Sequence, residues 1–245
     1  MKVTAPRVAA LYDVHGNLPA LEAVLAEVPD DAAIVSGGDV FSGPMPVETL
    51  ARLRGLGPRV TFVRGNADRD LGPYDERWRA RYEWLLEQLT PEEHALAEAW
   101  PETATLDVDG LGPTLFCHGT PRSDIEAITA ITSDERLREI LSDVAEKAIV
   151  CGHTHHQFDR RISDTRVVNA GSVGMPYEGR PGAYWALFGP DVEFRRTEYD
   201  LTAAAQAIRA TSYPDPEEKI ELLTSPYPAD EAAEVLERRA LEGLP

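Results

Sequence analysis

Apolar runs alternate with polar turns along the first 66 residues of the chain. Runs rich in Val, Ile, Leu and Ala at residues 8–12, 32–36 and 60–63 have the length of buried β-strands. Between them, residues 18–27 and 46–54 repeat apolar positions at helical spacing. This strand–helix–strand–helix–strand order predicts a parallel sheet with crossover helices on its faces. Binding sites in such sheets form beyond the carboxyl ends of the strands.

Residues 73–100 combine aromatic side chains with many Arg and Glu, and they predict two helices. Thr90 is a good N-cap because Pro91 follows in the first turn, with Glu92 and Glu93 behind it. We interpret the segment as a helical insertion at about 73–100 whose aromatic residues mostly pack against the core. A lid over a binding site is the alternative.

The second half of the chain predicts short strands joined by tight turns, followed by helices. Asp109 and Gly110 lie between two apolar runs and are typical of a β-hairpin. Strands are expected at 103–108, 114–117, 147–151, 158–162, 166–169, 183–188 and 192–197, and one helix at 133–144. Helices at 201–210, 216–223 and 229–241 make a helical C-terminal extension at about 201–245, for which covering the sheet, shaping a pocket and forming a dimer face stay open.

Together these elements predict an α/β fold in which two mixed sheets pack face to face between outer helices. The chain of 245 residues is long enough for a full core, and we expect one domain, residues 1–245. Cys117 and Cys151 both end apolar runs, so two buried free thiols are favoured over a disulfide.

The composition of the chain favours some classes of protein and substrate over others. A hydrophobic fraction of 43% and a charged fraction of 27% are typical of a globular protein. No apolar stretch approaches the roughly 18 residues that span a bilayer, and the N-terminus lacks the layout of a signal peptide, so we expect a cytoplasmic protein without a membrane partner. The net charge of −18 makes extended nucleic-acid binding an unfavourable hypothesis. A small phosphorylated substrate remains compatible, because bound metals would reverse the local charge. The oligomeric state stays open.

Polar side chains follow five of the predicted strands directly. They are all Asp, Asn or His, and four of the six histidines are among them. Carboxylate, amide and imidazole ligands together suit Mn²⁺, Fe, Zn²⁺, Ni²⁺ or Co²⁺, and the absence of thiolates argues against a closed structural zinc site. The candidate metal ligands are Asp13, His15, Asp39, Asn66, His118, His153 and His155.

These blocks, in this order, resemble those of the calcineurin-like metallophosphoesterases, and in particular a small bacterial and archaeal phosphodiesterase branch. The extended matches are DVHGN at 13–17, RGNAD at 64–68, HGTPRSD at 118–124, CGHTH at 151–155 and NAGSVG at 169–174. The resemblance covers about residues 8–200. It implies a four-layer α-β-β-α sandwich, which agrees with the two-sheet interpretation.

The resemblance also implies which residues hold each metal ion and which are catalytic. One metal would be held by Asp13, His15, Asp39 and His155, and a second by Asp39, Asn66, His118 and His153. Asp39 would bridge the two ions, and Asp39, Asn66 and His118 would count as catalytic residues. A metal-bridging hydroxide would attack the phosphate ester in line. We expect two divalent transition-metal ions, with manganese favoured.

The chain departs from the family pattern at residue 67. The commonest third block is Gly-Asn-His, and its His is thought to assist the leaving group, whereas this chain has Gly65-Asn66-Ala67. General acid assistance contributes roughly 10²–10⁴-fold in rate, so we expect weaker turnover of poor leaving groups. The small phosphodiesterase branch often lacks this His as well.

Basic residues beside the metal loops are candidate substrate contacts. Arg64, Arg69 and Arg122 flank these loops, and structural ion pairing is the alternative for each. His156 follows the predicted ligand pair, and support of the ligands from behind or exposure to solvent is its alternative to a substrate contact.

Three functions therefore stay open after the sequence. The first is a dinuclear metal-dependent phosphodiesterase, a hydrolase acting on a phosphate ester. The second is a phosphomonoesterase or protein phosphatase, which Ala67 disfavours. The third is a non-catalytic metal-binding interaction scaffold, which the complete set of seven ligands disfavours.

Overall fold

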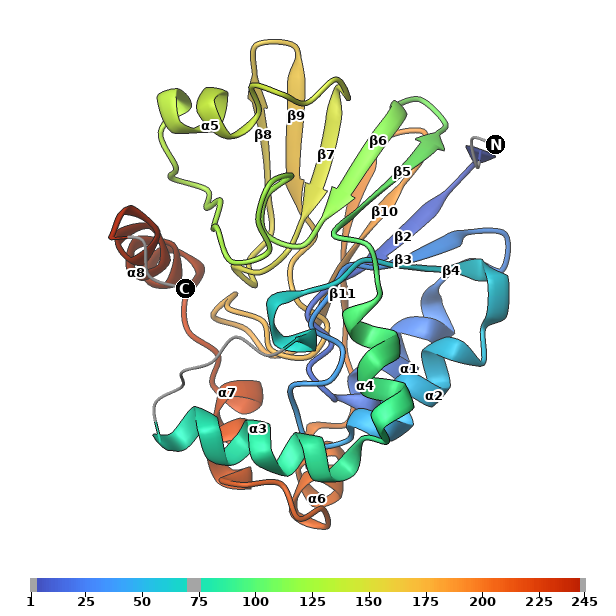
Figure 1. Cartoon of the computed structure of the whole chain (residues 1–245), viewed down its shortest axis with the longest axis vertical. Helices are drawn as coiled ribbons and strands as arrows, with labels where there is room; N and C mark the ends of the chain where they lie inside the picture. Colours follow the sequence, from blue (N-terminus) through green and yellow to red (C-terminus); the bar gives the residue numbers. More distant parts are fainter. Residues whose placement is uncertain (1–3, 70–75, 243–245) are drawn as a thin grey trace.

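Two β-sheets packed face to face form the centre of the molecule (Figure 1). The computed structural model describes residues 4–69 and 76–242. One sheet has five strands in the order β11-β10-β2-β3-β4, and the other has six in the order β1-β5-β6-β7-β9-β8. The five-stranded sheet contains β2 (Val8–Leu11), β3 (Ala33–Ser36), β4 (Val60–Phe62), β10 (Ala183–Phe188) and β11 (Val192–Thr197). The six-stranded sheet contains β1 (Thr4–Ala5), β5 (Thr103–Val108), β6 (Gly112–Cys117), β7 (Ala148–Cys151), β8 (Phe158–Ile162) and β9 (Thr165–Asn169).

The predicted parallel core is confirmed in strands β2, β3 and β4. Val8 pairs with Ala33 and Ile34 pairs with Val60, both in parallel register. The crossovers are α1 (Leu18–Glu27) and α2 (Pro46–Arg54). Strands β6, β7 and β9 are likewise mutually parallel, whereas β5 and β6 form the antiparallel hairpin expected around Gly110, whose φ is 78°. Both sheets are therefore mixed.

The space between the sheets is filled by the inward faces of both. Val35 and Tyr12 of the five-stranded side meet Phe116 and Val150 of the other sheet. Phe116 and Phe188 pack edge to face, with ring centroids 6.1 Å apart. The hydroxyl of buried Tyr12 donates to the Val150 carbonyl at 3.1 Å and so ties one sheet to the other. Such burial is the main favourable term in folding.

Helices cover the outer face of each sheet, which completes the four-layer α-β-β-α sandwich. On the five-stranded sheet, Leu21 of α1 and Leu50 of α2 pack against Ile34. On the six-stranded sheet, Leu137 of α5 (Asp134–Ile140) packs against Ile149. The predicted fold class is thus confirmed. The α5 helix is shorter than the expected 133–144, because beyond Leu141 the backbone continues in turns, in which the Ser142 N–H donates to the Glu139 carbonyl at 3.2 Å and the Val144 N–H to the Leu141 carbonyl at 3.1 Å.

The 73–100 segment forms the two expected helices, α3 (Glu76–Gln88) and α4 (Pro91–Glu98), while residues 73–75 lie outside the described residues. Trp100 is buried and stacks on Phe41 and Phe62, with ring centroids at 5.6 and 4.6 Å. Trp78 differs, because it is 42% exposed. The segment therefore has a core-facing part and an exposed part.

The C-terminal extension forms α6 (Leu201–Arg209), α7 (Pro216–Thr224) and α8 (Ala229–Leu241). Ile208 of α6 and Ile220 of α7 pack together in a small apolar cluster with Met45. Glu237 anchors α8 by accepting a hydrogen bond from Thr129 at 2.6 Å. None of the described helices has the length and apolar character needed to cross a bilayer. Cys117 and Cys151 are buried free thiols, as expected.

The Thr90 cap offers a test of the α4 interpretation. The Thr90 hydroxyl accepts from the Glu93 N–H at 3.2 Å, and the Glu93 carboxylate accepts from the Thr90 N–H at 2.9 Å. We expect Thr90→Ala to lower the free energy of unfolding by about 1 kcal/mol, because a donor at the helix start loses its partner. Thr90→Ser keeps the hydroxyl and should stay near wild type in a denaturant titration. Equal stability of all three proteins would contradict this role for the cap.

Candidate metal centre

Five loops leave the carboxyl ends of five strands and converge at one edge of the sandwich. Strands β2, β3 and β4 of one sheet lead to Asp13 and His15, to Asp39 and to Asn66. Strands β6 and β7 of the other sheet lead to His118, His153 and His155. The two sets meet, because the His153 backbone N–H donates to the Asp13 carboxylate at 2.9 Å.

The backbone at these loops is held in an uncommon conformation. Positive φ angles for residues other than glycine each cost free energy and persist only where the surrounding structure enforces them. Here the Asp13 N–H donates to the Gly38 carbonyl at 3.1 Å and the His15 N–H to the Asp39 carbonyl at 2.8 Å. Five of the seven candidate ligands have such angles: Asp13 (53°), His15 (47°), Asp39 (54°), His153 (66°) and His155 (58°). The strain is concentrated at the candidate site.

The imidazoles of His15 and His155 face each other through their Nε2 atoms. The Nδ1 of His15 lies 3.1 Å from the Ser42 carbonyl, and that of His155 lies 2.7 Å from the Met175 carbonyl. Each Nδ1 therefore donates to a carbonyl, and each Nε2 is the ring atom that faces the cluster. The two Nε2 atoms are 3.2 Å apart. A cation between them, a metal ion or a shared proton, would satisfy both rings at this spacing.

Asp13 adds a carboxylate to the same point. Its Oδ1 lies 3.3 Å from His155 Nε2 and 3.9 Å from His15 Nε2. This oxygen is buried and has no hydrogen-bond donor among the described residues. Burial favours its protonated form, yet the neighbouring histidines, His155 foremost, hold the pKa of Asp13 well below its ordinary value. A buried carboxylate oxygen without a donor fits a metal ligand.

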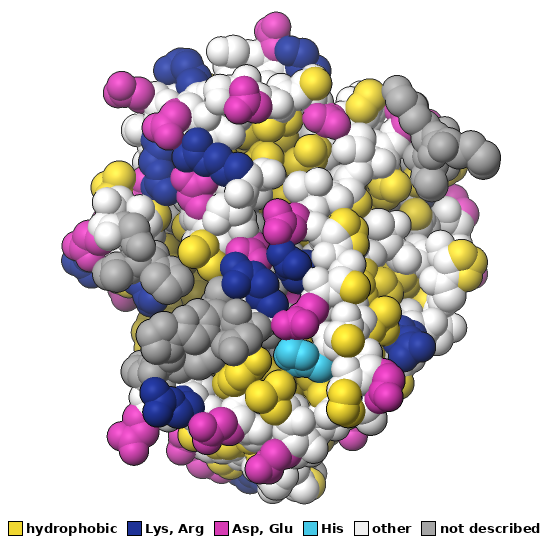
Figure 2. Space-filling model, in the orientation of Figure 1, with side chains coloured by type: hydrophobic (Ala, Val, Ile, Leu, Met, Phe, Trp, Pro, Cys, Tyr) yellow, Lys and Arg dark blue, Asp and Glu magenta, His cyan; other side chains and the backbone are white. Residues whose placement is uncertain are grey.

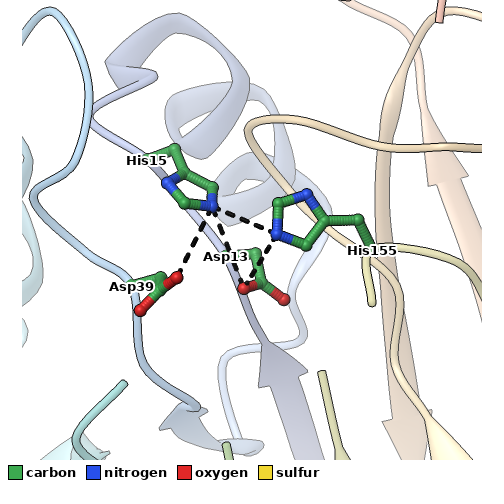
Figure 3. A group of neighbouring side chains, drawn as sticks. All are labelled: Asp13, His15, Asp39 and His155. Carbon is green, nitrogen blue, oxygen red and sulfur yellow. Dashed lines mark hydrogen bonds and ion pairs between the residues drawn. The ribbon is translucent and has the colours of Figure 1, made fainter. Parts of the chain in front are cut away.

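Asp39 completes the group and faces both halves of the site. Its Oδ2 lies 3.8 Å from His15 Nε2, and its Oδ1 lies 3.5 Å from His118 Nε2. Burial, and then the charge of Asp13, raise the pKa of Asp39 to about 8. Ligand atoms of Asp13, His15, Asp39 and His155 all lie within 4.8 Å of one another (Figure 3). These four residues form a buried cluster suited to a metal ion.

A second group of candidate ligands lies on the other side of Asp39. His118 Nδ1 lies 2.9 Å from the Gly37 carbonyl, and its Nε2 lies 2.9 Å from the Asn66 Oδ1. The ring of His153 packs edge-on beside His118, with centroids 5.1 Å apart. Burial, and then His118, lower the pKa of His153 to about 3, so the ring is neutral. His118, Asn66 and His153 thus lie together on this side of the cluster.

Asp68 supports the centre from behind, a role that the sequence interpretation missed. Its carboxylate accepts three backbone N–H groups, from Asp39 and Val40 at 2.8 Å and from Gly65 at 2.9 Å. It thereby joins the loop after β3 to the loop after β4. Burial, and then Asp39, raise the pKa of Asp68 to about 7. A sequence signal existed, since an Asp follows Asn66 by two residues, but nothing in the pattern showed that it is buried.

Close backbone packing sets the other loops. A Cβ at Gly43 would lie 1.6 Å from the His15 carbonyl oxygen, so only glycine fits there. Asn169 donates to the Gly152 carbonyl at 2.7 Å and to the Thr154 hydroxyl at 2.9 Å. These contacts hold the turn that carries His153 and His155, as the placement of the NAGSVG block suggested.

The three candidate substrate arginines are engaged in ion pairs. Arg69 binds Asp124 through two bonds of 2.6 and 2.7 Å, and Arg64 pairs with Glu102 at 2.6 Å. Arg122 pairs with Glu126 at 2.7 Å, which raises the pKa of Arg122 above its ordinary value. These contacts favour the structural alternative, and contact with a substrate stays a prediction for each.

His156 is buried, and both of its ring nitrogens meet the backbone. Nδ1 lies 2.9 Å from the Thr154 carbonyl, and Nε2 accepts from the Ala130 N–H at 3.3 Å. Such a ring supports the loop after β7 and has no free nitrogen for a substrate. These contacts favour the support role over the substrate contact.

A cavity of about 540 Å³ opens beside the metal cluster. His15 and Ser42 form part of its lining, and helices α3, α7 and α8 form most of the rest. Two of its residues that the sequence did not single out are Tyr177 and Lys219. Lys219 is buried, and this burial, followed by the charge of Arg81, lowers the pKa of Lys219 to about 7. The C-terminal extension thus helps to shape a pocket.

The raised pKa of Asp39 predicts a pH-dependent penalty in metal-free protein. The carboxyl of Asp39 has a pKa near 8 in the folded chain and an ordinary value of 3.8. Between these two pH values the folded chain binds more protons than the unfolded chain, so the free energy of unfolding falls as the pH rises. Asp39→Asn imitates the protonated form. In EDTA we expect the variant to unfold at a higher temperature than wild type. Its gain in free energy of unfolding should grow from pH 5 to pH 8 and reach on the order of 1–3 kcal/mol.

Exposed Asp109, at the tip of the β5–β6 hairpin, supplies the control. Asp109→Asn makes the same change in charge, and its stability relative to wild type should not vary with pH in this range. A gain for Asp39→Asn that stays constant across the pH series would show that the carboxyl of Asp39 does not titrate as described.

Comparison with known proteins places this geometry in a family. A model of the calcineurin-like phosphoesterase superfamily domain matches residues 7–188. The chain is similar to a metallophosphoesterase from Sphaerobacter thermophilus, with 27% identity, a TM-score of 0.72, and coverage of 90% of this chain and 98% of that one. It shares the fold of a hypothetical protein from Pyrococcus horikoshii OT3, with 22% identity, a TM-score of 0.75 and coverage of 91% and 99%. No curated protein sequence matches the chain. The chain therefore belongs to the calcineurin-like phosphoesterase superfamily and is a metal-dependent hydrolase of that family.

Proposed function

We propose that this protein is a dinuclear metal-dependent phosphodiesterase. The observation that carries the proposal is the 3.2 Å approach of the His15 and His155 Nε2 atoms beside the donor-less Asp13 Oδ1. Such a convergence of acceptors is stable only around a cation. The Sphaerobacter thermophilus protein, a metallophosphoesterase at 27% identity, supports the same class of reaction.

In this proposal the chain holds two cations through two overlapping sets of ligands. Asp13, His15, Asp39 and His155 hold the first, and Asp39, Asn66, His118 and His153 hold the second. Divalent ions in these positions would neutralise the phosphate charge and activate a water molecule. Nitrogen and oxygen ligands without thiolate suit Mn²⁺, which we propose as the ion, with Fe, Zn²⁺, Ni²⁺ and Co²⁺ as the other members of the class.

Two features support a diester over a monoester. Residue 67 is Ala, so this position has no side chain that can protonate a departing alkoxide; its backbone N–H instead donates to Asp39 Oδ1 at 2.8 Å. The 540 Å³ cavity also gives room for a second ester group beside the metal cluster. A monoester has no second ester group to place there.

A small substrate fits the charge distribution better than a long nucleic acid. The chain carries a net charge of −18. On the face shown in Figure 2, Lys and Arg side chains are interspersed with Asp and Glu and form no continuous basic surface. Binding of a polyanion depends on many neutralised phosphates, so a compact phosphodiester is the proposed substrate class.

The reaction class can be tested with two aryl substrates. With Mn²⁺ bound, we expect kcat/KM for bis(p-nitrophenyl) phosphate to exceed that for p-nitrophenyl phosphate by about tenfold or more, which corresponds to about 1.4 kcal/mol in the barrier. EDTA and Asp39→Asn should abolish both activities. Faster monoester turnover would favour the phosphomonoesterase alternative. Protein that carries two metals by elemental analysis and hydrolyses neither substrate would favour the interaction scaffold.

Residue 67 predicts a dependence on the leaving group. We expect Ala67→His to raise turnover of an aryl diester with an unsubstituted phenyl leaving group by roughly 10²-fold, because a general acid then assists departure. The p-nitrophenyl diester needs little assistance and should change little. Ala67→Gln introduces a polar side chain that cannot transfer a proton and is the control. The same rate change for both substrates, or for Gln and His alike, would refute the missing-acid interpretation.

A further inference from the structure

Lys219 places a buried cation in the wall of the cavity beside the metal cluster. Its side chain is 4% exposed, and it lines the cavity together with His15. Within the described part of the chain, no carboxylate or hydrogen-bond acceptor pairs with the Lys219 ammonium. A buried charge without a partner is costly, and an anionic ligand would offset that cost.

The neighbouring cation, Arg81, differs because protein groups already hold it. Its guanidinium donates to Glu218 at 2.7 Å and lies 5.2 Å from the centre of the Trp78 ring and 5.9 Å from that of Tyr213. Arg81 is therefore built into the wall, and of these two cavity cations Lys219 is the one that has no protein partner in the described chain. It is the residue suited to meet an anion.

Aromatic side chains share the lining of the cavity with Lys219 and His15. Tyr177 stacks on the candidate ligand His155, with ring centroids 4.9 Å apart and planes 23° apart. Tyr227 meets Tyr177 edge to face at 6.0 Å and is itself 57% exposed. Trp78 is 42% exposed on another part of the lining. Exposed aromatic groups around a pocket are typical of a surface on which a flat ring binds.

The cavity is pre-formed, because separate contacts hold its walls. Ile220 and Leu223 of α7 pack against Ile208 and Met45. On α8, Glu237 accepts from Thr129 at 2.6 Å and pairs with Arg136 at 3.3 Å. A volume of about 540 Å³ lies within the usual range for small-ligand sites. The cavity thus has fixed walls and a volume suited to a ligand of nucleotide size.

We infer that this cavity selects the ester group of the substrate: an aromatic ring lies against Tyr177 and Tyr227, and a second anionic group binds Lys219. A phosphodiester of a nucleoside that carries a further terminal phosphate has this chemistry. The inference rests on the proposed phosphodiesterase function for the scissile bond, while the cavity itself is independent of it. Lys219 is then a specificity-determining residue and not part of the metal cage.

A matched pair of substrates tests the role of Lys219. The thymidine dinucleotide with a 5′-terminal phosphate, pTpT, carries the second anion, and TpT lacks it. With Mn²⁺ bound, we expect Lys219→Met to raise KM for pTpT by roughly 10- to 100-fold, the range for loss of a charged hydrogen bond. TpT and bis(p-nitrophenyl) phosphate should keep their wild-type KM. Lys147→Met removes an exposed lysine just before β7 and should change none of the three.

Binding to metal-free protein gives a readout that does not need turnover. By titration calorimetry, wild type should bind pTpT more tightly than TpT by about tenfold or more, and Lys219→Met should bind the two alike. The thermal unfolding temperature of Lys219→Met should equal or exceed that of wild type, because the variant buries no unpaired charge. A marked fall in that temperature, with equal losses for pTpT and TpT, would assign Lys219 a structural role and overturn the inference.

The outcomes also separate this inference from the proposed function. If metal-loaded wild type hydrolyses no aryl diester but still binds pTpT through Lys219, the proposed reaction fails and the anion site stands. If the diester is hydrolysed but Lys219→Met leaves the pTpT to TpT ratio unchanged, the anion site fails and the phosphodiesterase stands.

Discussion

Buried hydrogen-bond acceptors that cannot satisfy one another meet at the centre of this protein. The Nδ1 atoms of three imidazoles face the backbone carbonyls of Gly37, Ser42 and Met175, so their Nε2 atoms face two carboxylates and, for His15 and His155, each other. A group that satisfies this set together must be a cation, because Asp13 Oδ1 has no hydrogen-bond donor among the described residues. A divalent cation does so directly, and the surrounding structure is organised to keep this set in place.

The scaffold holds that set through its backbone. Asp13, Asp39 and His155 have positive φ angles, and hydrogen bonds between loops of different strands hold the backbone there. Asp68 adds to this support, since its one buried carboxylate accepts hydrogen bonds from N–H groups of two loops. Because each loop is anchored at a strand end and packed against the next, displacement of one ligand would disturb its neighbours. The stability of the sandwich thus maintains the strained backbone conformations at the site.

The metal cluster alone does not select a substrate, and the C-terminal helices add what it lacks. In the proposed reaction, Ala67 leaves no side-chain proton donor at that position, which would favour esters that leave readily or are helped by other contacts. In the proposal, Lys219 of α7 and the aromatic side chains Tyr177 and Tyr227 beside it in the cavity lining supply such contacts. Binding energy from a remote part of the substrate can then serve positioning at the reacting phosphorus. Chemistry and selectivity thereby come from different parts of the chain.

The local sequence pattern by itself determined much of the secondary structure and the set of candidate ligands. Short apolar runs followed by Asp, Asn or His indicated both the parallel strands and the polar edge, because parallel strands end together. Thr90 marked a helix start by cap chemistry that acts within three residues. The burial of Asp68, the ion pairs of Arg64, Arg69 and Arg122, and the exposure of Lys219 to a cavity were decided only by the tertiary structure. Each depends on partners far away in the chain, as when Arg69 meets Asp124 across 55 positions. A side chain's charge is written in the sequence, but whether that charge faces solvent, a partner or an unfilled cavity depends on how distant segments pack.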